Sequence, residues 1–440
     1  MKSLKKCFYC CIAILFVCNG SAMNHNRSSS MILQPLKKLS GNDSTVSLQP
    51  IRLSESESLS DLTQVIGKNK ADVSVPFSPK EEFTFSYANE YEESSDDDEI
   101  DSTSSSSSPY NISLSRLFST PKPPVKIILS IDGGGSRGII PLFYVNELSR
   151  RLEKEFGNNI RLPIDMYAGT SVGALIATAT AMGKQHEVHE RYFSIVNQIF
   201  SYKWWKWPFT KIFLGYTYEP DGRAAAIREL VTPENEKEIE SDLIIPFCSA
   251  KTHDIFKYRN YANDKRFSLF DALMSSSAAP TYFPPHVFTG LDNEHYEGTD
   301  GGIFANHPGA IALDDAFIRY PGSRYIMISI GTGQASASGN TTKGRNLISW
   351  AQKISDLFMN LQSKKTDDTL ISIAGNHHTE TFRYIRINPT LDRDDYITDG
   401  TSTAHLERLE MIARQSIEPG GSEKRKFEEV FNILKGRLDY

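Results

Sequence analysis

The segment Gly169-Thr-Ser-Val-Gly173 contains a serine whose surroundings favour nucleophilic chemistry. Its pattern, G-x-S-x-G, is typical of a sharp turn between a strand and a helix, which holds the serine hydroxyl clear of the sheet. Such a hydroxyl attacks a carbonyl carbon when a base removes its proton and hydrogen-bond donors stabilise the oxyanion that forms. Ser171 is therefore the candidate nucleophile, and the chain must supply a base and donors elsewhere.

A glycine-rich loop, Asp132–Gly138, follows the apolar run Val125–Ile131 and contains the pattern G-x-G-x-x-G. Its backbone N–H groups can hold either the phosphates of a dinucleotide or an oxyanion. A dinucleotide site also needs an acidic residue at the end of a second strand about 20 residues later. Glu153 and Glu155 have that spacing, but they fall at the end of an amphipathic helix. We therefore favour an oxyanion hole, with donors from the amides of Gly133, Gly134 and Gly135.

Asp300 is the candidate base. It is followed by Gly301 and Gly302, which let the backbone turn tightly and bring the carboxylate inward. None of the histidines has a position that singles it out. His307, close to Asp300 in the sequence, keeps open the alternative of an esterase with a Ser-His-acid site.

Two histidines that resemble a zinc helix do not have its spacing. The segment His186-Glu-Val-His-Glu190 differs from H-E-x-x-H, so we interpret it as a solvated helix end. We expect no metal site and no cofactor.

Three segments in this order resemble the signatures of patatin-like phospholipases: Asp132–Gly138, Gly169–Gly173 and Asp300–Gly302. Ser275–Pro285 and Ser329–Gly333 are also similar to that family, so the resemblance extends from Val125 to Gly333. One departure is Asn306-His307-Pro308, which stands where relatives commonly repeat asparagine.

The resemblance implies a lipid acyl hydrolase of the phospholipase A type that cleaves carboxylic esters of phospholipids through an acyl-enzyme. Ser171 would be the nucleophile and Asp300 the base of a dyad without a catalytic histidine. The glycine loop would be the oxyanion hole. Residues that would support the site are Arg137, Gly138, Gly169, Gly173, Gly301 and Gly302. For Arg137 two roles stay open, to anchor the loop or to steer a phosphate head group.

The elements around these motifs alternate between strands and helices. Val125–Ile131 and Ile164–Ala168 are expected strands, and each precedes a glycine turn and a helix. The first of these helices has Pro141 in its first turn and an apolar face; the second covers Ala174–Met182, with Gly183 as its cap. Further expected strands are Leu243–Phe247, Tyr325–Ile330 and Phe382–Ile387. The chain is therefore predicted to be an α/β protein, a patatin-like sandwich with a mostly parallel central sheet flanked by helices.

The chain divides into three parts by composition. Residues 1–22 combine lysines, an apolar run and small residues, as a signal peptide does, so we expect export, with a lipidated Cys18 or a retained helix as alternatives. Residues 23–124 are rich in serine and acidic residues and are expected to be a disordered extension. Residues 125–440 form the expected domain, with core motifs in 125–333 and a helical and strand part in 334–440. Cys248 is then the lone mature cysteine and is expected to be a buried strand residue.

Charge and aromatic patterning limit the partners. The formal net charge is −6, and the eight acidic residues between Glu90 and Asp101 contribute −8 of it. The rest of the chain is therefore nearly neutral and gives no reason to expect nucleic acid as a partner. Trp204, Trp205 and Trp207 lie beside lysines, which suits either peripheral membrane contact or a cover over the site. The need for an activating partner, and a catalytically idle lipid-binding role on the same fold, stay open.

Overall fold

The computed structural model describes residues 123–158, 160–201, 215–263, 265–336, 347–376, 381–392 and 394–439. The expected signal peptide, almost all of the expected extension and the three clustered tryptophans lie outside the described residues. In the part of the chain that is described, no helix is both long enough and apolar enough to cross a membrane.

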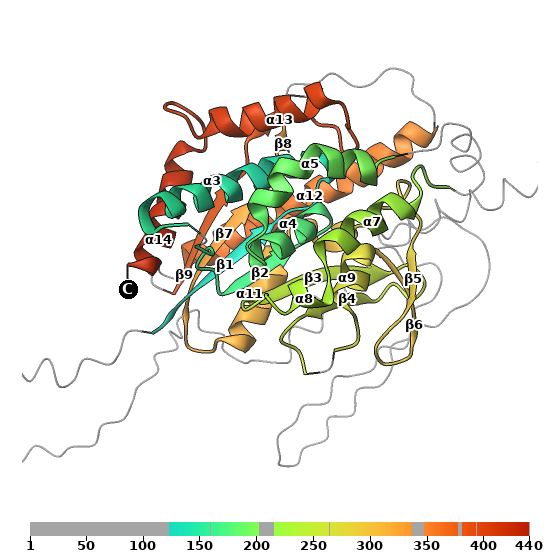
Figure 1. Cartoon of the computed structure of the whole chain (residues 1–440), viewed down its shortest axis with the longest axis horizontal. Coiled ribbons are helices and arrows are strands. Elements are labelled where there is room, and N and C mark those ends of the chain that lie inside the picture. Colours follow the sequence, from blue (N-terminus) through green and yellow to red (C-terminus); the bar gives the residue numbers. More distant parts are fainter. Residues whose placement is uncertain are drawn as a thin grey trace, which may run out of the picture. The chain divides into compact units, whose positions relative to one another are not determined.

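The described residues form one eight-stranded sheet with the order β5-β6-β3-β2-β1-β7-β9, and β4 pairs with β3 (Figure 1). The parallel strands are β1 (Val125–Ile131), β2 (Met166–Gly169), β3 (Asp242–Ser249), β7 (Arg324–Ile330) and β9 (Phe382–Ile387). The strands β4 (Ile255–Arg259), β5 (His286–Thr289) and β6 (His295–Asp300) pair antiparallel at the β3 side. Two short strands, β8 (Gln334–Ala335) and β10 (Thr390–Leu391), pair separately.

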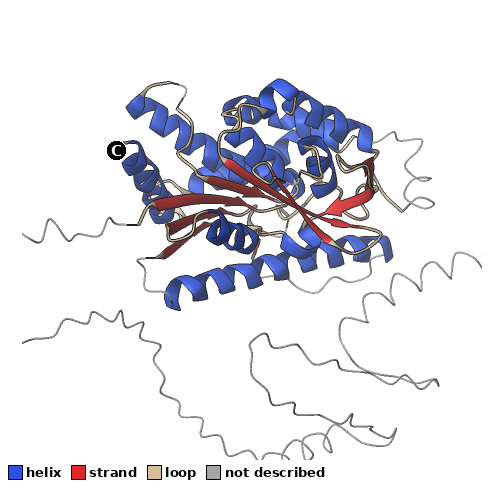
Figure 2. Ribbon diagram, turned by 90° about the horizontal axis from the view of Figure 1, so that it is seen from below, coloured by secondary structure: helices blue, strands red, loops and turns tan. Residues whose placement is uncertain are grey.

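Helices cover both faces of this sheet (Figure 2). Alternate residues of β1 point to opposite faces, so Ile127 and Leu129 pack in one apolar cluster and Ile128 in another. The first cluster includes side chains of α3 (Ile139–Phe156), α4 (Val172–Ala181), α5 (Gln185–Ile199), α7 (Pro220–Leu230), α9 (Leu269–Ser276), α13 (Thr403–Ser416) and α14 (Lys424–Leu438). The second includes α11 (Gly309–Arg319) and α12 (Leu347–Asn376). The shorter helices are η3 (Gly135–Gly138), α8 (Pro233–Glu236) and α10 (Gly302–Ala305).

The expected fold class is confirmed: the sheet is mostly parallel and lies between helices. β1 and β9 have the predicted bounds, and Cys248 is buried in β3 as expected. β2 begins two residues later than predicted. α4 begins two residues earlier than predicted, because the turn between the two elements occupies only Thr170 and Ser171. The antiparallel strands β4, β5 and β6 were not predicted, and one of them carries Asp300.

Candidate active site

Ser171 lies at a tight turn between β2 and α4. Its backbone has φ 55° and ψ −127°, a conformation that is costly for a residue with a side chain. The turn is this tight because its flanks are glycines: a Cβ on Gly169 would lie 2.3 Å from the Gly173 carbonyl oxygen. The Ser171 N–H donates to the Ser276 hydroxyl at 3.1 Å, and that hydroxyl donates to the Pro246 carbonyl at 2.7 Å. These contacts hold the serine hydroxyl at the start of α4.

Asp300 is the last residue of β6, and its carboxylate lines the same pocket as Ser171, whose hydroxyl lowers the pKa of Asp300. The Gly302 N–H donates to Asp300 Oδ1 at 2.7 Å, and Gly301 between them approaches the Pro246 carbonyl too closely for a side chain. Burial raises the pKa of Asp300 to about 6, against the opposing effects of the Gly302 amide, the Ser171 hydroxyl and the Arg223 charge. A carboxylate with this pKa is a stronger base than an exposed one and is still ionised at neutral pH.

The glycine loop places two free amides beside Ser171. Gly134 and Gly135 line the same pocket as Ser171, and within the described chain neither N–H has a hydrogen-bond partner. The Gly133 N–H is different, because it donates to the Asn306 carbonyl at 3.0 Å. Of the three amides expected to form an oxyanion hole, those of Gly134 and Gly135 are therefore free among the described residues, whereas the Gly133 N–H fastens the loop.

Arg137 is buried under this loop rather than exposed to solvent. Its Nε donates to the Gly134 carbonyl at 3.3 Å, and its guanidinium carbon lies 3.7 Å from the centre of the Tyr396 ring. Of the two roles that the sequence left open, these contacts are those of a loop anchor. Gly138, which follows it, lets the loop pack against α4: a Cβ there would lie 2.5 Å from a methyl carbon of Val172.

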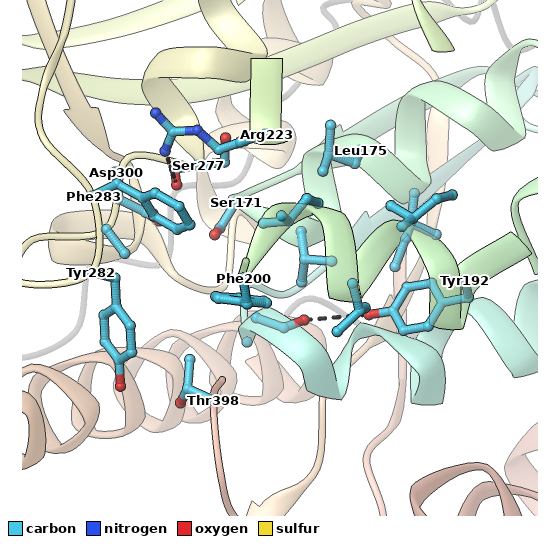
Figure 3. A pocket seen from close by; sticks show the side chains of 18 of the residues that line it. Ser171, Leu175, Tyr192, Phe200, Arg223, Ser277, Tyr282, Phe283, Asp300 and Thr398 are labelled. Atoms are coloured by element: carbon cyan, nitrogen blue, oxygen red, sulfur yellow. Dashed lines mark hydrogen bonds between the residues drawn. The ribbon is translucent and has the colours of Figure 1, made fainter. Parts of the chain in front are cut away.

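Ser171 and Asp300 open into a largely apolar pocket (Figure 3). Apolar walls suit a hydrocarbon chain, and the few polar groups of such a pocket orient the ligand. Its apolar and aromatic lining residues are Val172, Leu175, Ile176, Val188, Tyr192, Ile195, Val196, Ile199, Phe200, Ala279, Tyr282, Phe283 and Met359.

Comparison with known proteins agrees with this geometry. Residues 129–313 match the family model described as patatin-like phospholipase. The chain carries a patatin-like phospholipase domain. Patatin-like protein 2 from Arabidopsis thaliana is 29% identical over 336 residues, which cover 65% of this chain and 81% of that protein. A cGAMP-activated phospholipase from Vibrio cholerae is 31% identical over 208 residues, covering 43% of this chain and 57% of that protein.

Two further relatives are more distant. Patatin-17 from Solanum cardiophyllum is 26% identical over 336 residues, covering 67% of this chain and 84% of that protein. The crystal structure of VipD from Legionella pneumophila is 14% identical and covers 72% of this chain and 68% of that chain, with a TM-score of 0.31 that is too low to bear on the fold. The family match supports a general activity as a lipid acyl hydrolase.

A buried ion pair supports the glycine loop of the patatin-like domain from the other side. The Arg386 guanidinium, on β9, donates to both oxygens of Asp132 at 2.6 and 3.2 Å. Burial alone would lower the pKa of Arg386, but the Asp132 carboxylate raises it above its ordinary value. Both charged groups are nearly inaccessible to water, so removing either one would leave the other as an unpaired buried charge.

His307 lies in this buried network and not at Ser171. Its Nε2 is 2.9 Å from the Tyr384 hydroxyl and 3.1 Å from the Ser329 hydroxyl, and the Gly309 N–H donates to its Nδ1 at 3.0 Å. Burial lowers the pKa of His307 well below its ordinary value, so the ring is neutral. These contacts are structural and give no support to a Ser-His-acid site.

The segment His186–Glu190 lies on α5 without a shared metal site. His186 Nε2 lies 2.9 Å from Glu153, and His189 Nε2 lies 3.6 Å from Glu410. Among the described residues, no group of three or more potential ligands could hold a metal ion. Glu153 and Glu155 are on α3 rather than at a strand end, so the acidic residue of a dinucleotide site is not in place.

Several residues of the site were not found from the sequence. Ser276 lies in the family-like segment Ser275–Pro285, so its neighbourhood was a usable signal. Asn306 and Thr332 hold the backbone of Gly133, and Thr332 Oγ1 donates to its carbonyl at 2.7 Å. Arg223 enters the pocket from α7 without any motif around it.

Proposed function

We propose that this patatin-like protein is a phospholipase of the A type, which cleaves carboxylic ester bonds of phospholipids with Ser171 as nucleophile and Asp300 as base. One observation carries the proposal: Ser171 and Asp300, a buried carboxylate of raised pKa, line the same apolar pocket. A serine, a base within hydrogen-bond reach and a nearby pair of free amides are the parts that acyl transfer needs.

In the first half of the reaction, Asp300 accepts the proton of Ser171 as Oγ attacks the carbonyl carbon of the ester. The Gly134 and Gly135 amides donate to the carbonyl oxygen as it becomes negative. The proton then passes from Asp300 to the leaving alcohol oxygen, the carbon–oxygen bond of the ester breaks, and the acyl group stays on Ser171.

In the second half, Asp300 accepts a proton from water, whose oxygen attacks the acyl carbon of the acyl-enzyme. The same amides stabilise the second oxyanion. Asp300 returns the proton to Ser171 Oγ as the bond to the acyl group breaks, and a fatty acid is released. In both halves Asp300 accepts the proton that leaves Ser171 or water and passes it on.

The test is fatty-acid release from mixed phospholipid vesicles with a chelator present, comparing the native protein with Ser171→Ala and Asp300→Asn. We expect both variants to lose about 10³-fold in rate or more. Asp254→Asn, an exposed acid before β4, is the matched control and should keep the native rate. Hydrolysis that survives in Ser171→Ala contradicts the proposal.

Labelling by a fluorophosphonate probe separates a silent enzyme from a binding protein. If the probe labels the native protein at Ser171 but no fatty acid is released, the protein is an enzyme whose activator or preferred ester substrate the assay lacks. If neither labelling nor release occurs, the idle lipid-binding alternative replaces the proposal.

Export through residues 1–22 and membrane contact through Trp204, Trp205 and Trp207 are further proposals, and both segments lie outside the described residues. N-terminal sequencing of the protein from culture medium tests export. Vesicle binding that is unchanged after all three tryptophans become alanine would remove the second proposal.

A further inference from the structure

Arg223 is a buried cation inside the pocket that holds Ser171 and Asp300. It comes from the first turns of α7, and only 1% of its surface is exposed. Figure 3 shows its guanidinium group beside Asp300, Ser277 and Phe283. Within the described lining of this pocket, Arg223 is the sole positively charged side chain.

The hydrogen bonds of Arg223 are incomplete. Its Nη1 donates to the Ser277 carbonyl, and its guanidinium carbon lies 4.4 Å from the centre of the Phe283 ring. Its Nε and Nη2 are buried and have no hydrogen-bond partner among the described residues. Buried donors are almost always paired, and an unpaired one costs the full desolvation of the group. Two such donors on one cation therefore indicate a ligand.

The two unpaired donors form one edge of the guanidinium group. An Nε–H and the Nη2–H beside it point the same way, which matches two oxygens of a carboxylate or a phosphate. Burial lowers the pKa of Arg223 to about 10, and the Asp300 charge opposes this shift. The side chain is therefore still a cation at neutral pH.

We propose that Arg223 is an anion-binding residue of the acyl pocket, whose Nε and Nη2 hold two oxygens of an anionic group on an amphiphilic ligand. That group is the phosphodiester of a phospholipid substrate or the carboxylate of the released fatty acid. The inference rests on the proposed function for its place in the reaction, but binding itself needs no hydrolysis.

The first experiment measures binding in the full chain with Ser171→Ala, so that nothing is turned over. Dodecyl phosphate, dodecanoate and the neutral dodecyl maltoside are titrated by calorimetry below their micellar concentrations. Adding Arg223→Gln should weaken binding of at least one anion about tenfold relative to the neutral ligand. Equal changes for all three ligands, or none, would overturn the assignment.

Two other variants control for folding and for charge. Arg228→Gln removes an exposed arginine of the same helix and should bind all three ligands as the Ser171→Ala protein does. Arg223→Lys keeps the charge but not the paired donors, so it should bind the anions less well than arginine while thermal melting shows an intact fold. Full retention of anion binding in Arg223→Lys would contradict a role for the paired donors.

The second experiment identifies the source of the anion. If it is the substrate phosphodiester, Arg223→Gln lowers the ratio of kcat/KM for a phospholipid to that for a diacylglycerol about tenfold. If Arg223 binds the carboxylate of the product, the ratio of the two kcat/KM values stays unchanged, and Arg223→Gln instead weakens inhibition by oleate about tenfold. An unchanged ratio together with unchanged oleate inhibition counts against Arg223.

The two hypotheses fail in different ways. A native protein that hydrolyses no ester refutes the proposed function, while the binding titration still tests Arg223. A native protein that hydrolyses esters but shows no anion preference refutes the inference and leaves the Ser171–Asp300 reaction intact.

Discussion

Asp132 and Asp300 are both buried carboxylates at the end of a strand, and glycines follow both, yet their surroundings differ. Both oxygens of Asp132 pair with Arg386. The carboxylate of Asp300 accepts from one backbone donor, the Gly302 N–H, and the Ser171 hydroxyl and the through-space charge of Arg223 also lower its pKa. The charge partner thus separates a carboxylate held in an ion pair from the one that we propose as the base, although the two motifs look alike in the sequence.

Position in the sheet explains this difference. Asp132 follows β1, where Arg386 of β9 reaches across β7 and also donates to the Ser329 hydroxyl at 2.6 Å. Asp300 ends β6 in the antiparallel part of the sheet, next to Phe247 of β3. Burial raises the pKa of both carboxyl groups, and the Arg386 guanidinium limits that rise at Asp132 because the two charges neutralise each other.

The largest effect is expected from breaking the ion pair. Asp132→Asn or Arg386→Met leaves one buried charge without its partner, so the free energy of unfolding should fall by about 3–5 kcal/mol. Urea denaturation measures this loss. The double variant should recover part of it, and single variants as stable as the native protein would show that the pair is not structural.

Asp300→Asn should change stability in the opposite direction. The pKa of Asp300 is about 6 in the folded protein against 3.8 for an unburied group. A raised pKa contributes stability at pH below 3.8, which is lost as the pH rises through about 6. At pH 8 the variant, which lacks this loss, should therefore be more stable than the native protein by up to about 3 kcal/mol. Urea melts at pH 4 and 8 measure it; a variant less stable at pH 8 contradicts the raised pKa.

The rate of the native protein should follow the ionisation of Asp300. Only the carboxylate can accept the Ser171 proton, so kcat/KM should fall about tenfold for each pH unit below about 6 and level off above it. Initial rates on a soluble ester from pH 4.5 to 8.5 measure this profile. A limb near pH 4 would show that the carboxylate titrates as an exposed group does.

The smallest effect is expected at His307. His307→Gln removes a neutral ring that contacts Tyr384, Ser329 and the Gly309 amide, so kcat should stay within about tenfold of the native value while stability falls by about 1–3 kcal/mol. Rate and thermal melting are measured on the same preparation. A loss of about 10³-fold in kcat with an intact fold would restore the Ser-His-acid alternative.

Much of the parallel half of the fold was predictable because its signals are local. The apolar run Val125–Ile131 became β1 with the predicted bounds, and the glycines of Gly169–Gly173 produced the turn at Ser171. The antiparallel half was not predictable in this way. The strand His295–Asp300 has no clear apolar alternation, and it exists because β3 and β5 pair with it.

Local sequence patterns also could not predict which hydrogen-bond donors are left unpaired in the folded protein. Three glycine amides in a row look equivalent in Asp132–Gly138, but Asn306 removes one of them by accepting the Gly133 N–H. Arg223 shows the reverse case, because its unpaired donors are visible only once the pocket is built around them.

By itself the sequence determined the strand-turn-helix units and the types of residue at their turns, because backbone freedom at glycine and apolar periodicity act over a few neighbours. The tertiary structure decided which carboxylate pairs with an arginine, which glycine amides are free, and which donors of Arg223 have no partner among the described residues. Desolvation and charge pairing cause these differences, and they join residues as far apart as Asp132 and Arg386, separated by 254 positions.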